Sequence, residues 1–381
     1  MKIEPFLMER MQSTYEHHVE INLSESGVHP LTVGELLEGA PERETLFSRL
    51  LCYTQTNGTP ALRAEIAAMY PGATIEHVEV TNGGAEANFV VCWSLLDRDD
   101  EVVMMVPNHM QAWGLTRAFA GRVHPWPLRE GPGPRWQPDL DALRALVTPR
   151  TKLIAICNPN NPTGARLTAQ ELDAIGRMAD PYGAWVLADE IYRGAELDGR
   201  DTPSMWGRAD RVIVTSGLSK AYGLPGLRIG WVVAPPATTE SLWSYHDYTT
   251  IAPSALSDAL ATVALAPARR ARLLERTRAI LRANYPVVAS WLDSRPQAFS
   301  YIPPEAGAII YLRYATTVNS TELTTRLREE KGVLIVPGDH FGMDGYLRIG
   351  FGSDLTALRE GLSRLEDVLE QDGSSGPDTR E

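Results

Sequence analysis

Short apolar segments alternate with helical segments between residues 78 and 234, and this alternation constrains the fold of the 381-residue chain most strongly. The apolar segments are rich in valine, isoleucine and leucine, which is typical of strands buried on both faces of a sheet. Helices between most of these strands favour parallel connections. The predicted strands are 78–81, 102–106, 153–157, 185–189, 212–215 and 229–234, and the predicted helices include 110–120, 140–147 and 168–182.

The sequence changes character after residue 250. A long Arg-rich helical stretch leads into a second group of strands and helices, and 381 residues exceed the roughly 250–300 at which one core stops growing. We predict an α/β fold in which a large domain holds a mostly parallel seven-stranded sheet flanked by helices. A smaller α+β domain is built from both termini. The predicted divisions are 1–43 (N-terminal arm and part of the small domain), 44–275 (large domain), 276–370 (small domain) and 371–381 (flexible tail).

The formal net charge of -12 argues against a nucleic acid or an anionic membrane as partner, because both attract basic surfaces. The N-terminus has no long hydrophobic region, and no apolar run approaches the ~18 residues of a membrane span. We therefore predict a cytoplasmic protein. Cys52, Cys92 and Cys157 are odd in number and far apart, which favours reduced core thiols over disulfides or a zinc site, so no metal is predicted.

Lys220 is one of only four lysines in the chain. It follows the strand at 212–215 and precedes a turn with Gly223, Pro225 and Gly226, and open α/β sheets bind ligands in loops at strand ends. Desolvation and the nearby Arg228 are expected to depress the pKa of its ammonium below the usual ~10.4. The lysine is a candidate for Schiff-base formation, and the alternative is a surface lysine on a loop.

Two further candidates follow predicted strands. Gly83 and Gly84 form a strand-to-helix turn that would expose backbone N–H groups to an anion, with a plain tight turn as the alternative. Asp189 follows four apolar residues, where a buried carboxylate requires a cation such as a protonated ring nitrogen. A helix cap or a structural ion pair would also explain Asp189.

Asparagine and arginine residues complete the candidate set. Residues 158–164 contain too many turn formers for regular structure, so they are expected to form a rigid loop that presents amide side chains. Arg348 lies in a strand pattern, where a buried guanidinium offers two parallel donors to a carboxylate. A salt bridge within the protein is the alternative.

Together these residues resemble the aspartate-aminotransferase branch of fold-type I pyridoxal 5′-phosphate (PLP) enzymes, aminotransferase class I/II, over nearly the whole chain. The matching motifs are Gly83-Gly84, Asn161-Pro-Thr-Gly164, Asp189-Glu-x-Tyr192, Ser219-Lys220, Arg228 and Arg348, in the family's order and spacing. The resemblance implies PLP as cofactor, an internal aldimine with Lys220, and Asp189 paired with the pyridinium nitrogen.

The resemblance also implies the remaining roles. Tyr192 and Asn161 would hydrogen-bond the phenolic oxygen of the cofactor. The cofactor phosphate would be held by Ser219, Arg228, the backbone at Gly84 and Ala85, and Tyr53 from the other subunit of a homodimer. Arg348, with Asn161 and Gly27, would bind the substrate α-carboxylate. A dicarboxylate substrate would need a second cation, for which Arg193 and Arg117 are candidates.

Two positions depart from the family pattern. Gly217 replaces a common serine, so phosphate binding would depend on Ser216 or on Arg228. His109 stands where the family usually has a tyrosine, phenylalanine or tryptophan that stacks on the cofactor ring. An imidazole can stack, and it can also transfer protons. Both roles of His109 stay open.

The main functional prediction is transamination of an L-amino acid to a keto acid, through the Lys220 aldimine and an α-carbanion. The alternative is a PLP-dependent lyase or cyclase in natural-product biosynthesis, acting by β-elimination from a cysteine S-conjugate, decarboxylating deamination or cyclisation of an arginine derivative. A narrower resemblance to the capreomycidine-synthase-like group, carried by 26–29, 34–37 and 218–228, supports this alternative. A nicotinamide dehydrogenase is excluded because no Gly-x-Gly-x-x-Gly follows a strand. The 40 residues at the N-terminus offer no DNA-binding domain for a transcriptional regulator.

Overall fold

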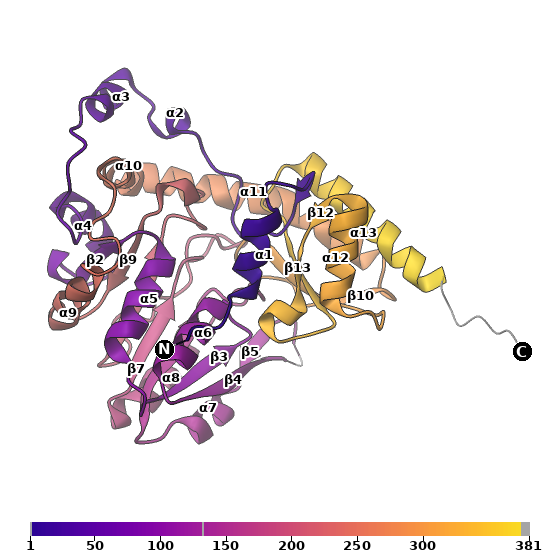
Figure 1. Ribbon diagram of the computed structural model, residues 1–381, viewed down its shortest axis with the longest axis horizontal. Coiled ribbons are helices and arrows are strands. Elements are labelled where there is room, and N and C mark those ends of the chain that lie inside the picture. Colours follow the sequence, from indigo (N-terminus) through magenta and orange to yellow (C-terminus); the bar gives the residue numbers. More distant parts are fainter. Residues whose placement is uncertain (1, 132, 375–381) are drawn as a thin grey trace, which may run out of the picture.

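The protein consists of two lobes in a computed structural model that describes residues 2–131 and 133–374 (Figure 1). The large lobe is built on an eight-stranded sheet of order β2-β9-β8-β7-β6-β3-β4-β5. Its strands are β2 (Val78–Thr81), β3 (Glu101–Val106), β4 (Arg122–Glu130), β5 (Trp136–Pro138), β6 (Thr151–Cys157), β7 (Trp185–Asp189), β8 (Val212–Gly217) and β9 (Gly230–Val233). Its helices are α4 (Pro60–Ala67), α5 (Gly84–Leu95), α6 (Met110–Phe119), α7 (Leu140–Leu146), α8 (Ala169–Ala179), α9 (Pro236–His246) and α10 (Ala255–Leu265).

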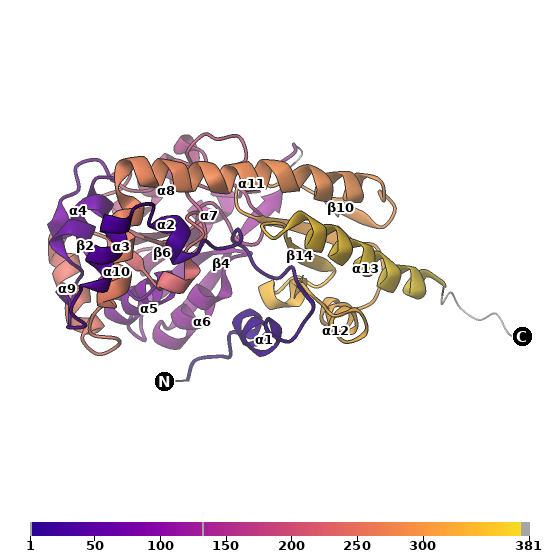
Figure 2. The same ribbon diagram turned by 90° about the horizontal axis from the view of Figure 1, so that it is seen from above.

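Both faces of the large sheet are apolar, which explains the unbroken hydrophobic strands. Val102 and Met104 of β3 pack into one buried cluster, whereas Val103 and Met105 of the same strand pack into the other. Successive side chains of a strand point to opposite faces, so a strand covered on both sides must be apolar throughout. Helices α5, α6 and α9 lie on one side of the sheet, and α7 and α8 lie on the other (Figure 2).

Strands β4, β3, β6, β7 and β8 run parallel, and β9 is antiparallel to both of its neighbours. The carboxyl ends of the parallel strands therefore meet at one edge, which carries the segments that follow Val106, Cys157, Asp189 and Gly217. Within the described residues, the large sheet has eight strands rather than the predicted seven. The sequence analysis named neither β4 nor β5, because Pro125, Pro127 and Pro138 interrupt the strand pattern near the sheet edge.

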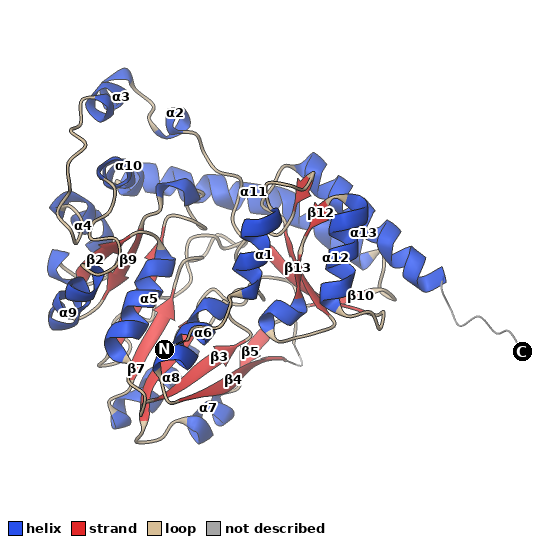
Figure 3. Ribbon diagram, in the orientation of Figure 1, coloured by secondary structure: helices blue, strands red, loops and turns tan. Residues whose placement is uncertain are grey.

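The small lobe contains a four-stranded antiparallel sheet of order β10-β11-β14-β13 (Figure 3). Its strands are β10 (Phe299–Tyr301), β11 (Ile309–Tyr314), β13 (Val336–Pro337) and β14 (Tyr346–Gly350), and its helices are α12 (Ser320–Lys331) and α13 (Leu355–Ser374). The N-terminal strand β1 (Ile21–Asn22) pairs with β12 (Val333–Leu334), so the N-terminal segment joins this lobe. Residues 371–374 continue α13 and 375–381 lie outside the described residues, so the flexible tail at 371–381 stays a prediction.

Helix α11 (Pro267–Asp293) extends along both lobes (Figure 2). It crosses the predicted domain boundary at residue 275 without interruption, so the four divisions of the chain stay a prediction. The N-terminal arm contains a helix, α1 (Leu7–Tyr15), between the lobes (Figure 1). Helices α2 (Val33–Leu36) and α3 (Ala40–Phe47) form an arch that stands away from the body. Within the described residues, no helix is long and apolar enough to span a bilayer.

Candidate active site

A cavity of about 470 Å³ opens at the carboxyl edge of the large sheet, beside α1. Nine residues predicted from the sequence line it: Gly84, Ala85, His109, Asn161, Asp189, Tyr192, Ser219, Lys220 and Arg228. They come from five separate chain segments that end at or near this edge. The lining also includes residues of the N-terminal arm. Those in or near α1 are Phe6, Met8, Glu9, Gln12 and Glu16, and those further along the arm are Glu25 and Ser26.

Lys220 points into the cavity and pairs with an acidic residue that the sequence analysis did not consider. Its Nζ donates to Glu25 Oε2 at 3.2 Å. Burial lowers the pKa of Lys220, but the neighbouring Glu25 and Tyr192 outweigh burial, and the pKa is raised above its usual value. The predicted depression of this pKa is therefore wrong for the free lysine, because Arg228 is not the charge that dominates its surroundings.

Asp189 is a buried carboxylate without a cationic partner among the described residues. Asn88 Nδ2 donates to its Oδ2 at 3.0 Å, and the backbone N–H of Ile191 donates to Oδ1 at 3.1 Å. Thr215 Oγ1 fixes the Asn88 amide by donating to its Oδ1 at 2.7 Å. Burial raises the pKa of Asp189 although both donors oppose the shift. This carboxylate fits a protonated ring nitrogen, which would supply the missing positive charge.

The turn before α5 forms a cradle for an anion. Gly83 has a φ of +88°, and a Cβ atom at this residue would lie 2.3 Å from Arg228 Nη2. Only glycine therefore allows the guanidinium to approach the first turn of α5, where backbone N–H groups favour negative charge. Arg228 Nη1 also donates to Ser219 Oγ at 3.3 Å. These groups fit the phosphate of PLP.

Ser216 does not belong to this cradle. Its Oγ donates to the carbonyl of Glu190 at 3.2 Å, and the residue lines a different cavity. Of the two residues considered as replacements for the missing serine, Arg228 alone lies at the cradle. Gly217 leaves little room at its own position, because a Cβ atom there would lie 2.8 Å from the carbonyl oxygen of Ile229.

Arg348 lies fully buried beside the cavity. Its Nη1 donates to Asn161 Oδ1 at 2.9 Å and its Nη2 to the carbonyl of Ser24 at 2.5 Å, and no carboxylate among the described residues forms an ion pair with it. Burial lowers the pKa of Arg348. Its Nε is buried without a hydrogen-bond partner among the described residues. A buried guanidinium held only by neutral acceptors fits a carboxylate ligand.

Tyr192 and His109 both line the cavity. The Tyr192 hydroxyl donates to Ser26 Oγ at 2.8 Å, and burial raises the pKa of the phenol. His109 makes an edge-on contact with Phe6, with ring centroids 5.0 Å apart. Burial, with Lys220 and Arg348 nearby, lowers the pKa of His109 to about 3, so its imidazole is neutral at physiological pH.

Besides Arg348 and Ser216, further residues named from the sequence lie outside the lining. Gly27 packs behind Lys220, where a Cβ atom would approach the lysine Cδ to 3.5 Å. Tyr53 is 81% exposed, on the segment after α3. Of the candidate cations for a dicarboxylate, Arg117 pairs with Glu4 at 3.1 Å, and Arg193 lines the cavity that contains Ser216.

The sequence model of the family "aminotransferase class I and II" matches residues 20–365. The chain belongs to this family. Capreomycidine synthase of Streptomyces vinaceus is 32% identical over 96% of this chain and 93% of its own length. The crystal structure of a PLP-dependent aminotransferase from Streptococcus suis matches with a TM-score of 0.91 and 33% identity, covering 98% of this chain and 99% of its own. The PLP-dependent cyclase OrfR matches with a TM-score of 0.87 and 28% identity, over 97% and 98% of the two chains.

For this member of the aminotransferase family, the comparisons confirm the predicted family, the α/β fold class, an enzymatic function and PLP as the cofactor. The sequence analysis missed the N-terminal wall of its site. A signal was present, because Met8, Met11, Gln12 and Tyr15 recur at helical spacing. Asn88, one turn after Gly84 in α5, was also identifiable from its spacing.

Proposed function

We propose that this aminotransferase-family enzyme converts an L-amino acid to a keto acid by transamination, with PLP in the cavity of Lys220. The observation that carries the proposal is the convergence of Lys220, an unpaired buried carboxylate at Asp189 and an anion cradle at Gly84 on one space. PLP, when bound, supplies an electron sink for negative charge on the substrate α-carbon. Each of the three protein groups meets a different part of that cofactor.

The residues of the chain divide the remaining work. The first turn of α5, Ser219 and Arg228 hold the phosphate, and Asp189 holds a proton on the ring nitrogen. Arg348 binds the substrate α-carboxylate and so orients the α-carbon. The amine of Lys220 removes the proton of that carbon, which requires the neutral amine, and in transamination it would deliver this proton to the cofactor rather than back to the α-carbon.

We infer that the substrate side chain carries a positive charge. Besides Asp189, which would face the cofactor ring, three carboxylates, Glu9, Glu16 and Glu25, line the cavity, and its lining cations are Lys220 and Arg228, which the cofactor would engage. A second substrate carboxylate would meet repulsion from this wall. A cationic side chain paired with Glu25 would also weaken the contact between Glu25 and Lys220, which lowers the pKa of the lysine toward the value that proton transfer requires.

A lyase or cyclase is the second candidate, placing the enzyme in natural-product biosynthesis. The similarity to capreomycidine synthase and to the cyclase OrfR supports it, as does His109 at the position of the usual aromatic residue. A neutral imidazole can accept a proton during elimination or ring closure. The two candidates predict different fates for the substrate nitrogen.

One incubation separates these candidates. The holoenzyme receives a panel of amino acids, including arginine and aspartate, with 2-oxoglutarate, and the products are identified by mass spectrometry. Glutamate that appears together with a new keto acid supports transamination. Ammonia, a thiol or a cyclised amino acid that also forms when 2-oxoglutarate is left out supports the second candidate and contradicts the first.

We also propose that the enzyme works as a cytoplasmic homodimer in which Tyr53 reaches the partner's phosphate cradle. The arch and the segment after it expose Phe47, Leu50, Leu51 and Tyr53, each at least 79% accessible. Such a group of apolar side chains favours an interface. Three unpaired cysteines agree with a reducing compartment. Light scattering measures the assembly, and Tyr53→Phe should weaken PLP retention while leaving the dimer intact.

A further inference from the structure

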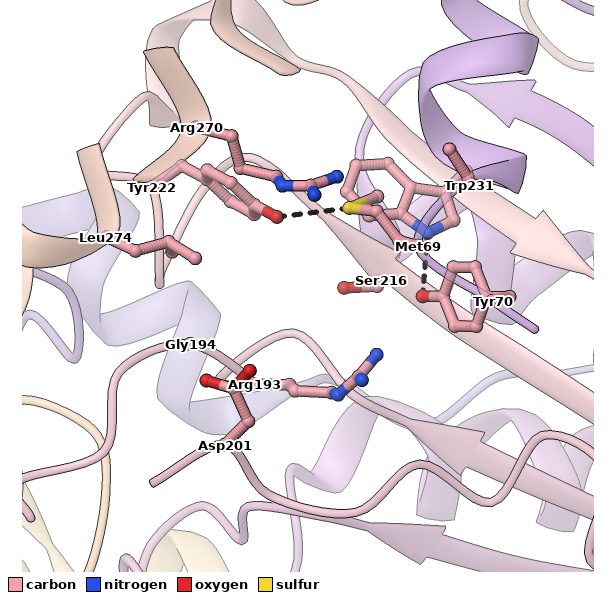
Figure 4. Close-up of a pocket in the computed structure, with 11 residues that line it drawn as sticks. Met69, Tyr70, Arg193, Gly194, Asp201, Ser216, Tyr222, Trp231, Arg270 and Leu274 are labelled. Atoms are coloured by element: carbon pink, nitrogen blue, oxygen red, sulfur yellow. Dashed lines mark hydrogen bonds between the residues drawn. The ribbon is translucent and has the colours of Figure 1, made fainter. Parts of the chain in front are cut away.

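A second cavity of about 220 Å³ is lined by Tyr70, Arg193, Asp201, Trp231 and Arg270, among others (Figure 4). It shares no lining residue with the candidate active site. Two of its residues nevertheless flank the catalytic lysine in sequence: Ser216 precedes it by four positions and Tyr222 follows it by two. The remaining walls come from the end of α4, the segment after Tyr192, and the start of α11.

Two guanidinium groups enter this second cavity from opposite walls, Arg270 from α11 and Arg193 from the segment after Tyr192 (Figure 4). The Arg270 side chain makes no hydrogen bond or ion pair with any described residue, and its Nη1 is fully buried. Arg193 Nε donates to the carbonyl of Thr202 at 3.0 Å, and its Nη1 forms an ion pair with the buried Glu190, 3.8 Å from Oε2 and so without a hydrogen bond. Buried donors without acceptors are costly and rare.

The hydroxyl groups of the second cavity add to this surplus of donors. Tyr222 donates to Met69 Sδ at 3.5 Å, and a thioether is a weak acceptor. Tyr70 accepts from Trp231 Nε1 at 3.1 Å, which leaves its own proton for another acceptor. Burial raises the pKa of Tyr222 to about 12 and that of Tyr70 further, so both remain donors at neutral pH.

The carboxylate that lines the second cavity does not satisfy these donors. Asp201 accepts from Arg278 Nη2 at 2.5 Å, and the same nitrogen donates to Glu196 at 2.7 Å. The charge of Asp201 is therefore engaged by Arg278. Among the described residues, the Arg270 guanidinium therefore faces the second cavity without an acceptor, next to further donors from Arg193, Tyr70 and Tyr222.

We propose that the second cavity is a binding site for a small oxyanion, a carboxylate or phosphate group, held by Arg270, Arg193 and the hydroxyl of Tyr222. This ligand is distinct from the PLP phosphate and from the substrate carboxylate. Because Tyr222 belongs to the loop of Lys220, an anion here restrains the backbone that positions the catalytic amine.

The test uses the PLP-loaded enzyme, whose phosphate cradle is filled. Inorganic phosphate and succinate are titrated separately by calorimetry into the wild type, Arg270→Gln and the matched control Arg272→Gln on the exposed side of the same helix. We expect saturable binding of at least one anion, weakened about tenfold or more by Arg270→Gln and unchanged by Arg272→Gln. The tighter anion identifies a phosphate or a carboxylate as the natural group.

A second variant keeps the test decisive if Arg270→Gln fails to fold or to load PLP. Tyr222→Phe removes one hydroxyl and should weaken the same binding event by about fivefold. Anion binding at the substrate site through Arg348 would be insensitive to both variants. Equal affinities in the wild type, Arg270→Gln and Tyr222→Phe, or no saturable binding of either anion to the wild type, would overturn the proposal.

Discussion

Glu25 Oε2 lies 3.2 Å from Lys220 Nζ, although 195 positions separate the two residues in the chain. The pair joins the N-terminal segment to the loop at the end of β8, and it raises the pKa of the lysine. The side chain of Glu25 is half-exposed, so solvent screens part of this effect. The ion pair therefore influences the pH at which Lys220 loses its proton, and it contributes little to the stability of the fold.

Replacing Glu25 with glutamine should lower the pKa of the Lys220 ammonium in the cofactor-free protein. The reason is the loss of the nearest negative charge. Alkaline titration by NMR of the lysine, labelled at its side chain, measures the shift, and Glu16→Gln is the matched control from the same wall. An unchanged lysine pKa in Glu25→Gln would show that Glu25 does not raise it.

The same pair of variants tests the substrate class. With Glu25→Gln, kcat/KM for arginine should fall by about tenfold or more, whereas the value for a neutral amino acid should change little. Steady-state kinetics on three substrates, one cationic, one neutral and one acidic, measure the preference. An equal fall in kcat/KM for all three substrates would contradict the proposal that the substrate side chain is cationic, and it would leave the proposed PLP chemistry untested.

Lys220→Ala should abolish turnover and the visible absorption of the cofactor joined to the lysine. No other lysine lines the cavity in the described part of the chain, so no neighbouring amine can replace it. Spectra of the purified variant with added PLP, next to wild type, measure both. Retention of the absorption band would refute the role of Lys220.

Asp189→Asn should reduce kcat by about 100-fold or more, because the amide removes the negative charge that stabilises a protonated ring nitrogen. Asn88→Ala, which removes the 3.0 Å donor to Asp189 and the acceptor of Thr215 Oγ1 but keeps the carboxylate, should reduce kcat less. Rapid-mixing spectroscopy with PLP and substrate measures the step. Equal losses in the two variants would indicate that Asp189 serves positioning rather than charge.

Stability should fall as the pH rises from about 6.5 through 9. His246 is buried between Glu79 and Glu86, with Nδ1 2.7 Å from Glu79 Oε1, and these carboxylates raise the pKa of His246 to about 9 despite burial. A group with a raised folded-state pKa stabilises below its unfolded pKa and loses that contribution above the folded one. Thermal unfolding of wild type and His246→Gln at pH 6 and pH 10 measures this contribution. The difference in Tm between the two proteins should be smaller at pH 10 than at pH 6.

The sequence predicted the parallel core well because burial on both faces leaves a continuous apolar record in each strand, as in 102–106. Strand β4 has no such continuous apolar sequence, because the prolines at 125 and 127 interrupt it. The residues around Lys220 were predictable from local motifs, but the direction of its pKa was not. That direction depends on Glu25, whose proximity only the folded chain reveals.

The contact of Arg348 with Asn161 shows the same division. Each residue was predicted separately, and the family resemblance linked them to one carboxylate. Their 2.9 Å hydrogen bond depends on how β14 of the small lobe meets the loop after β6. No periodic pattern in the sequence predicts this contact between β14 and the loop after β6. Apolar periodicity predicts the elements within each lobe, whereas contacts between the lobes follow from tertiary packing.

Helix α11 gives the two lobes a common mechanical axis. Its 27 residues correspond to about 40 Å of helix, with Arg270 at one end beside the loop of Lys220. Toward the other end, Asn284 donates to the carbonyls of Phe351 and Ser353, directly after the strand that carries Arg348. One continuous helix thus connects the lysine loop to the segment that follows the carboxylate-binding strand. Any tilt of α11 would therefore be felt at both of these places.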